Sequence, residues 1–379
     1  MNMTEPSRLK EILDRIVPKN IAALPVYQPG KPIEEVEREL GITGAIKLAS
    51  NESVTGPSPR AVAAMQNMLD RVAEYPDGGA FQLRNAVAKE LDVGADELIF
   101  GAGCNEVIHL AVRALCRPGQ DDVITHDFAF ISYKIAALAH GAPFTSTPTN
   151  DVLGCDVDAL LERASDKTRI VFLANPNNPT GSHLSPEELK RVVLELPEAA
   201  LLVVDEAYFE YASRSGAAYQ SSLELRALRP MMLTLRTFSK IHGLAGLRVG
   251  YGVAQRELIE IIGKARRPFN VNSLAQAAAT AAAGDRDHVA KAAAAALAGI
   301  AQLREGASAL NVKAYPSLGN FVLIDVGGGS APIAQALQRR GVIVRPMAAW
   351  GLPNCIRVST GTPEQNQRAI DTLAKVLAE

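Results

Sequence analysis

The middle of the chain alternates short apolar runs with longer amphipathic stretches. An apolar run of about four to eight residues between turn signals is typical of a strand buried on both faces. The intervening stretches have apolar residues at helical spacing, and Ser185 and Pro186 offer one of them an N-cap and a first-turn proline. This alternation predicts an α/β fold with a mostly parallel sheet covered by helices. The expected strands are ELIFG (97–101), DVITH (122–126), RIVFLA (169–174), ALLVVDEA (200–207), MMLTL (231–235) and RVGYGV (248–253), with helices at 105–117, 185–196 and 254–264.

The C-terminal part follows a different order. An Ala-rich helical stretch runs from about residue 273 to 304, is interrupted at Gly284, and is expected to be a tightly packed connection. The pattern beyond it indicates a smaller α+β domain, and 379 residues exceed what one core usually fills. Strands are expected there at NFVLID (320–325), GVIVRP (341–346) and CIRVST (355–360), with helices at 331–340 and from Pro363 onward.

Composition and charge exclude several classes of protein. Lys and Arg total 39 against 41 Asp and Glu, so the chain lacks the basic surplus that nucleic-acid binding requires. The 4 cysteines form no CxxC pair and the 6 histidines no HExxH motif, so we expect neither a disulfide framework nor a metal site. The sequence has no N-terminal signal core and no apolar run of about 18 residues, which predicts a cytoplasmic protein without a membrane partner.

Lys240 lies in the run LRTFSKIHGLAGLRVGY (235–251). A lysine amine can form an imine with an aldehyde cofactor, while nearby hydroxyls and the Arg248 guanidinium can hold the phosphate of that cofactor. Most lysines are solvated surface charges. This run alone therefore favours neither a catalytic lysine nor an ordinary surface lysine.

Two further polar positions follow expected strands. Asn178 lies in the turn ANPNNPTGSHLS (174–185), and Asp205 ends an apolar run with Tyr208 three positions later. The carboxyl ends of parallel strands meet at one edge of a sheet, so these side chains are expected in the same crevice. A carboxylate there needs a partner, and a protonated pyridine nitrogen would be one. The alternatives are a plain Pro/Gly turn and an aspartate that caps a loop.

Asn178, Asp205, Tyr208 and Lys240, in this order and each just past a strand, match a known constellation. The chain resembles the fold-type I pyridoxal-phosphate aminotransferases, and within them the histidinol-phosphate aminotransferase family. The resemblance covers nearly the whole chain. It is carried by LPVYQPGKPIEE (24–35), KLASNES (47–53), GPSP (56–59), EYPDGG (74–79), GAGCNEVI (101–108), NPNNPTG (175–181), DEAYFEY (205–211), RTFSK (236–240), GLAGLRVGY (243–251), RPFNVNSLAQ (267–276), NFVLID (320–325), VRP (344–346) and IRVSTGTPEQN (356–366).

The resemblance implies a fold-type I architecture, with a large domain built on a mostly parallel seven-stranded sheet, a smaller α+β domain and an N-terminal arm. The arm is expected at 1–30, the large domain at 51–280, and the small domain at 31–50 together with 281–379. Pyridoxal 5′-phosphate is the implied cofactor, and a small-molecule amino donor and a 2-oxo acid are the implied partners. A homodimer with shared active sites is implied as well.

The resemblance assigns five residues to the cofactor ring. Lys240 would form the imine and later move the proton between the substrate α-carbon and the cofactor. Asp205 would pair with the pyridine nitrogen. Asn178 and Tyr208 would hydrogen-bond the 3-oxygen, and Phe130 would stack on the ring.

The cofactor phosphate is expected at the start of a helix that follows the sequence GAG. Tyr75 resembles the family tyrosine that reaches the phosphate of the neighbouring subunit's cofactor, which makes the dimer part of the active site. The other implied phosphate contacts are the backbone amides of Cys104 and Asn105 and the side chains of Thr237, Ser239 and Arg248.

For the substrate, Arg357 would grip the α-carboxylate of glutamate or 2-oxoglutarate in a bidentate pair. Arg345 and, from the partner's arm, Tyr27 resemble the family's contacts to the distal phosphate of histidinol phosphate. Asn178 would face the substrate as well as the cofactor. The chain departs from the family pattern at GCNE (103–106), where Asn105 replaces an acid, and at THDFAF (125–130), which lacks the usual proline.

The resemblance predicts transamination between histidinol phosphate and 2-oxoglutarate by a ping-pong mechanism, in histidine biosynthesis. An aromatic amino acid aminotransferase is the alternative, and a decarboxylase resembling threonine-phosphate decarboxylase is less favoured. A ligand-sensing regulator on this fold would need a DNA-binding domain ahead of it, for which the N-terminal residues leave no room. A Rossmann dehydrogenase is a poor rival, because GxG at 101–103 lacks the third glycine.

Overall fold

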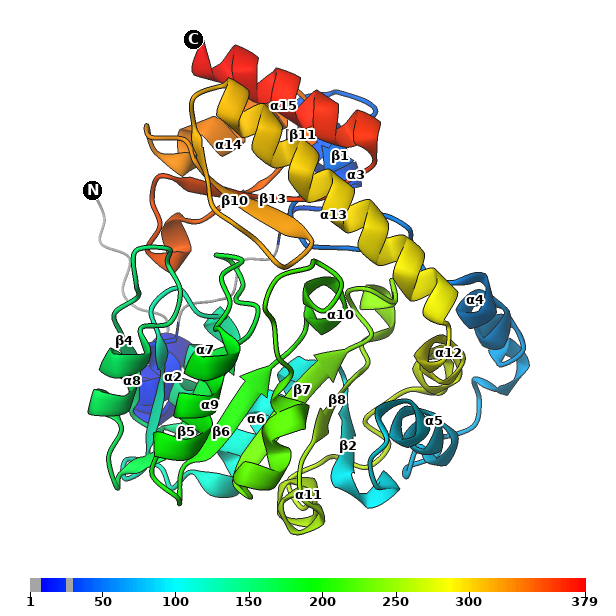
Figure 1. Ribbon diagram of the computed structural model, residues 1–379, viewed down its shortest axis with the longest axis vertical. Coiled ribbons are helices and arrows are strands. Elements are labelled where there is room, and N and C mark those ends of the chain that lie inside the picture. Colours follow the sequence, from blue (N-terminus) through cyan, green and yellow to red (C-terminus); the bar gives the residue numbers. More distant parts are fainter. Residues whose placement is uncertain (1–7, 25–29) are drawn as a thin grey trace.

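A seven-stranded sheet forms the centre of the larger part of the molecule (Figure 1). The computed structural model describes residues 8–24 and 30–379. The strands are β2 (Leu98–Gly101), β3 (Asp122–His126), β4 (Phe144–Thr147), β5 (Thr168–Ala174), β6 (Leu201–Asp205), β7 (Met232–Thr237) and β8 (Gly250–Val253). Their order is β2-β8-β7-β6-β5-β3-β4, and every neighbour pair is parallel except those of β8. The mostly parallel α/β sheet is therefore confirmed. The apolar pattern misses only β4, because FTST contains a single apolar residue.

Helices cover both faces of this sheet because alternate strand residues point to opposite sides. Val203 packs in one core cluster and its neighbours Leu202 and Val204 in another. The first cluster contains α6 (Cys104–Leu115), α7 (Ile131–His140) and α11 (Arg256–Gly263), and the second contains α8 (Val157–Arg163) and α9 (Pro186–Glu195). A third cluster packs α4 (Pro59–Gln66), α5 (Phe81–Leu91) and α12 (Ser273–Ala283) beside β2 and β8.

Helix α9 begins as the sequence predicts. Ser185 Oγ accepts the N–H of Glu188, and the Glu188 carboxylate accepts the N–H of Ser185. This reciprocal capping box satisfies two backbone donors that the first turn leaves without partners.

A smaller antiparallel sheet lies in the C-terminal part of the fold. It consists of β9 (Lys313–Ala314), β10 (Phe321–Asp325), β12 (Arg345–Pro346) and β13 (Cys355–Ser359), in the order β12-β13-β10-β9. Helices α13 (Arg286–Ala309), α14 (Ser330–Arg339) and α15 (Pro363–Leu377) share its core. A two-residue strand, β1 (Ile46–Lys47), pairs in parallel with β11 (Val342–Ile343), so an N-terminal segment joins this layer. In Figure 1, α13 runs from beside α12 up to α15.

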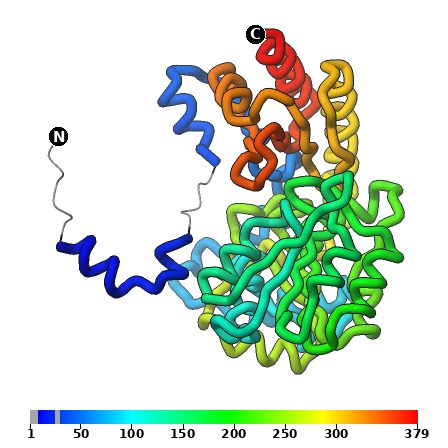
Figure 2. The backbone as a smooth tube through the Cα atoms, turned by 90° about the vertical axis from the view of Figure 1, so that its left-hand side faces the viewer, coloured from blue at the N-terminus to red at the C-terminus, as the bar shows by residue number. Residues whose placement is uncertain are grey.

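The N-terminal helices lie at the periphery. Figure 2 shows α1 (Arg8–Ile16) extending away from the rest of the chain, whereas α2 (Lys19–Ala22) lies against the large sheet layer. Asn20 Nδ2 anchors α2 by donating to two carbonyls of α7. Helix α3 (Ile33–Leu40) packs Val36 against Ile343. Across residues 8–24 and 30–379, no helix combines the length and the apolar character needed to cross a membrane.

Small residues set the spacing between α13 and α15. The interruption expected at Gly284 is confirmed, since α12 ends at Ala283 and the Asp285 side chain caps the start of α13. Further along α13, a Cβ added at Gly306 would lie 2.5 Å from Cδ1 and 2.6 Å from Cγ1 of Ile370 on α15. The Ile370 side chain thus occupies the space that a side chain at position 306 would need.

We predict that Gly306→Ala destabilises the protein by about 1–3 kcal/mol, because overpacking outweighs the gain of about 1 kcal/mol in helix propensity. Gly263 at the end of α11 is the matched control, since a Cβ there meets nothing within 4 Å. Gly263→Ala should leave the protein as stable as before or more so. Thermal unfolding followed by circular dichroism measures both, and a Gly306→Ala protein that melts no earlier than wild type contradicts the packing argument.

Candidate active site

A cavity of 160 Å³ lies at the carboxyl ends of the parallel strands. Chain geometry explains its contents, because Asn178 follows β5, Asp205 and Tyr208 follow β6, and Lys240 follows β7. Ten of the residues predicted from the sequence line it together: Cys104, Asn105, Phe130, Asn178, Asp205, Tyr208, Thr237, Ser239, Lys240 and Arg248.

Lys240 is held in the cavity wall by backbone carbonyls. Its Nζ donates to Ser50 O at 3.3 Å and to Asn51 O at 3.4 Å. Withdrawal from water and, second, the positive charge of Arg357 together lower the pKa of Lys240 to about 8. The amine therefore has a sizeable neutral fraction near pH 8, where a lysine at the ordinary pKa of 10.5 is almost fully protonated.

Asp205 is a buried carboxylate whose oxygens both accept hydrogen bonds. Tyr133 Oη donates to Oδ2 at 2.8 Å, and the N–H of Ala207 donates to Oδ1 at 3.1 Å. Burial nevertheless raises the pKa of Asp205 to about 6. A cationic partner at this position would favour the ionised form.

Tyr133 is a site residue that the sequence reasoning misses. Its ring is fully buried, stacks on Phe172 with centroids 4.6 Å apart, and lines the cavity beside Phe130. The available signal was its position on α7, because residues three apart share a helix face and Phe130 is the predicted stacking residue.

An anion cradle forms one end of the cavity. Helix α6 begins at Cys104, so its first N–H groups and the positive end of its dipole face the cavity. Gly103 has φ +80°, and a Cβ there would lie 2.6 Å from Arg248 Nη2. A Cβ on Gly250 would lie 2.5 Å from the backbone nitrogen of Cys104. The two glycines thus let a guanidinium and a helix start approach one another, an arrangement that suits a phosphate.

Two hydroxyl side chains complete this cradle. Thr237 Oγ1 accepts the N–H of Ser239 at 3.0 Å, and Arg248 Nη1 lies 3.5 Å from Ser239 Oγ. Asn105 Oδ1 accepts a hydrogen bond from Ser132. The amide of Asn105 thus serves local structure, and its backbone remains at the helix start as the sequence predicts.

Arg357 borders the cavity without lining it. It lies on β13, is 6% exposed, and donates to Ala49 O at 2.7 Å and to Asn178 Oδ1. Through Asn178 the guanidinium reaches the cavity edge. Arg345 is paired with Arg357 in the register of β12 and β13, and its guanidinium lies 5.2 Å from the centre of the Trp350 ring.

Tyr75 is not brought into the cavity. Tyr75 is 83% exposed and stacks on Phe269 with ring centroids 4.9 Å apart, so it faces outward. Tyr27 lies outside the described residues.

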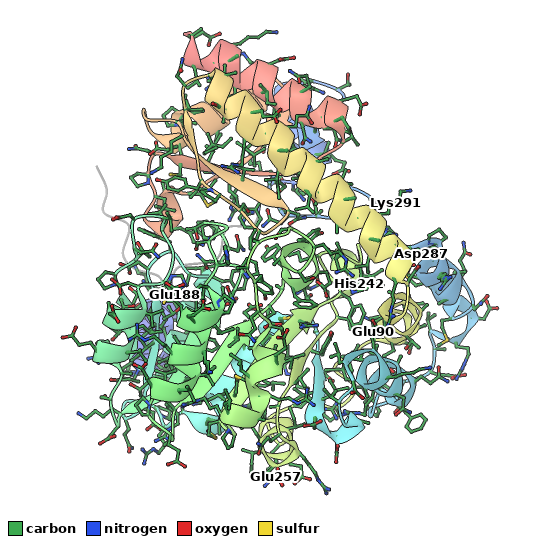
Figure 3. All side chains as sticks on the ribbon, viewed as in Figure 1. Glu90, Glu188, His242, Glu257, Asp287 and Lys291 are labelled. Atoms are coloured by element: carbon green, nitrogen blue, oxygen red, sulfur yellow. The ribbon has the colours of Figure 1, made fainter. Side chains whose placement is uncertain are left out.

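Two larger hollows contain none of the predicted site residues. A surface cavity of 810 Å³ lies along α15 against Arg340 and Arg368. Another, of 350 Å³, is lined by Glu90 and His242, which lie near one another below the start of α13 (Figure 3). Within residues 8–24 and 30–379, no three His, Cys, Asp or Glu side chains are grouped to hold a metal ion. The smaller cavity at the sheet edge is distinguished by its chemistry, not by its size.

Comparisons with known proteins show what the whole chain is similar to. The family model "Aminotransferase class I and II" matches residues 43–373. A histidinol-phosphate aminotransferase of Anaeromyxobacter sp. (strain Fw109-5) is 45% identical over 363 residues, covering 96% of this chain and 99% of the relative. Histidinol-phosphate aminotransferase 1 of Nitrosococcus oceani is 44% identical over 95% of this chain and 96% of its own. The crystal structure of histidinol-phosphate aminotransferase from Sinorhizobium meliloti in complex with pyridoxal-5′-phosphate has a TM-score of 0.86 and 28% identity, covering 100% of this chain and 99% of that one.

We predict that Lys240 titrates near pH 8 in the protein without cofactor, because burial disfavours its protonated form. Competitive acylation with a small amine reagent, read by mass spectrometry of the peptide 237–248, gives reactivity against pH. Exposed lysines such as Lys10 and Lys264 are the internal reference. A Lys240 midpoint that coincides with theirs contradicts the effect of burial.

Proposed function

This chain belongs to the histidinol-phosphate aminotransferase family of the class I and II aminotransferases, and on that premise we propose that histidinol phosphate is its amino donor and 2-oxoglutarate its acceptor. The enzyme is a pyridoxal 5′-phosphate-dependent aminotransferase. The observation that carries the transamination chemistry is the convergence of a lysine amine, a buried carboxylate and an anion cradle in one cavity. The names of relatives 42–45% identical over nearly the full chain support this donor.

The residues present fit the cofactor. The helix start and Arg248 suit its phosphate, Asp205 suits its pyridine nitrogen, and Phe130 offers a ring face. When bound, pyridoxal 5′-phosphate supplies an aldehyde that takes up the amino group and a ring that accepts the electron pair released at the substrate carbon.

Lys240 serves as the proton carrier in this proposal. Its neutral amine accepts the proton from the donor carbon that bears the nitrogen, and its ammonium returns a proton later in the reaction. The lowered pKa of Lys240, about 8, makes both forms accessible near neutral pH. Loss of the amine in Lys240→Ala removes both steps.

Asp205, Tyr208 and Asn178 orient and polarise the ring. Asp205, positioned by Tyr133, would hold the pyridine nitrogen in its protonated form. Tyr208 and Asn178 would donate toward the 3-oxygen. Arg357 binds the carboxylate of the acceptor. Its hydrogen bond to Asn178 connects this carboxylate-binding residue with a residue assigned to the cofactor ring. Arg345 and the partner subunit's Tyr27 bind the distal phosphate of the donor.

An aromatic amino acid donor is the competing proposal. The ring of Trp350 lies 5.2 Å from the Arg345 guanidinium, so an apolar surface is available beside the residue assigned to the phosphate. Decarboxylation stays less favoured, because the relatives named above are aminotransferases.

A homodimer in the cytoplasm is part of the proposal. The exposed Tyr75 and Phe269 stack on one surface, and α1 exposes Leu9, Leu13 and Ile16 on one side. Apolar surfaces of this kind are usually covered in an assembly. We also propose a large domain at 51–280 and a small domain formed by 31–50 together with 281–379. The pairing of β1 with β11 supports the assignment of 31–50 to the small domain.

The donor is tested by a half-reaction. With the cofactor-loaded protein, loss of the bound-cofactor absorbance after adding L-histidinol phosphate should be about 100-fold more efficient than after adding L-phenylalanine, because a charge-assisted phosphate contact is made by the first donor only. Arg345→Gln should reduce the efficiency with histidinol phosphate more than with phenylalanine. A preference for phenylalanine would contradict the proposed donor and the assignment of Arg345 and Tyr27 to its distal phosphate.

The shared active site is tested by subunit mixing. Lys240→Ala lacks the proton carrier, and Tyr75→Ala lacks a group assigned to the partner's phosphate site. If the sites are shared, dimers reassembled from equal amounts of both variants should regain about a quarter of the wild-type activity, since each hybrid contains one complete site. Sedimentation velocity checks that hybrids form. Hybrids that gain no activity contradict the position assigned to Tyr75.

A further inference from the structure

Asn51 is fully buried directly behind the cavity and belongs to no helix or strand. It is 1% exposed and has φ +54°, in the left-handed region that asparagine tolerates better than most residues. It does not line the cavity, yet it contacts two residues that do, Tyr208 and Lys240.

The orientation of the Asn51 amide is fixed by Ser359 on β13. Ser359 Oγ accepts the backbone N–H of Asn51 at 2.8 Å, and its hydroxyl donates to Asn51 Oδ1 at 2.8 Å. A serine hydroxyl has one proton, so the atom that receives it must be the amide oxygen. The amide nitrogen is thereby turned toward Tyr208.

This orientation dictates the direction of the Tyr208 hydroxyl. Asn51 Nδ2 donates to Tyr208 Oη at 2.9 Å, and an amide nitrogen can only donate. Tyr208 therefore accepts on this side, and its single proton is left for an acceptor on the side of the cavity. The phenol keeps that proton at neutral pH, because burial raises the pKa of Tyr208 to about 12.

The same turn holds the lysine. The carbonyls of Ser50 and Asn51 accept from Lys240 Nζ, and Asn320 Nδ2 donates to Asn51 O at 3.1 Å. Ser359 and Asn320 both come from the C-terminal layer. One buried turn thus connects that layer to Lys240 and to Tyr208 at once.

We propose that Asn51 is a positioning residue that makes Tyr208 a hydrogen-bond donor toward the 3-oxygen of the cofactor, with its own orientation set by Ser359. This inference rests on the proposed placement of the cofactor beside Tyr208. It does not depend on which amino donor the enzyme uses.

The test compares Asn51→Asp with Asn51→Gly. Aspartate has the same shape and keeps the acceptor for Ser359, but its second oxygen accepts from Tyr208 and so pulls the phenol proton away from the cavity. Glycine adopts φ +54° without strain and leaves Tyr208 free to donate. The Asp variant should therefore be the more impaired, whereas a purely structural role for Asn51 would make the isosteric Asp the milder change.

Two measurements with pyridoxal 5′-phosphate alone, without an amino donor, should show the Asp variant to be more impaired than the Gly variant. In Asn51→Asp, the pH midpoint of the bound-cofactor absorbance should rise by about one unit and the dissociation constant of the cofactor by about tenfold, because the 3-oxygen loses a donor. Both shifts should be smaller in Asn51→Gly. Circular dichroism confirms that the variants are folded.

A Tyr208→Phe background separates hydroxyl direction from charge. The carboxylate of Asn51→Asp perturbs Lys240 in either background, whereas an effect through the phenol disappears without it. The proposal predicts that most of the shift is lost when Tyr208 is Phe. Equal shifts in both backgrounds, or a Gly variant as impaired as the Asp variant, would overturn it.

Ser359→Ala provides the test if Asn51→Asp does not fold. Without the serine proton the amide is free to turn, so the absorbance midpoint should rise in the wild-type background and stay unchanged when Tyr208 is Phe. An unchanged midpoint in both backgrounds counts against the proposal. Failure of the donor proposal looks different, since it alters the half-reaction rates and leaves these cofactor titrations as they are.

Discussion

The site depends on a carboxylate buried at the end of β6. A buried charge is costly unless it is paired, so Asp205 dictates what must surround it. Its neighbour Glu206 fixes its position, because that side chain is fully buried, accepts the N–H of Ser222, and pairs with Arg236 at 2.9 Å. The ends of β6 and β7 are locked together by this ion pair. Lys240, three residues past β7, is delivered to the same cavity as a result.

Much of the fold and the centre of the site could be predicted because their signals are local in the sequence. Val203 and its neighbours form a continuous apolar run, which identifies a strand buried on both faces. Asp205 and Lys240 each stand just past such a run, so the edge they share follows from the topology of a parallel sheet. The resemblance to a known family added the identity of the cofactor, which the residues alone left open.

The parts that escaped prediction depend on contacts between distant segments. Tyr133 matters because its hydroxyl reaches Asp205, 72 positions away, and nothing in the run DFAFISY indicates that partner. Asn51 is oriented by Ser359, 308 positions away. Strand β4 escaped for a different reason, since FTST at a half-exposed sheet edge has no apolar pattern. Hydrogen-bond direction and edge position are properties of the assembled chain.

The connecting helix α13 is long enough that a small rotation at one end is a displacement of atomic size at the other. It has 24 residues and is therefore about 36 Å long, with its root at the break between Gly284 and Asp285. A rotation of about 5° at that root moves the far end by about 3 Å, since displacement grows with the length of the rod. That travel matches the length of one hydrogen bond. Arg357 and Asn178 meet from opposite layers, and a displacement of that size between the layers is enough to break their hydrogen bond.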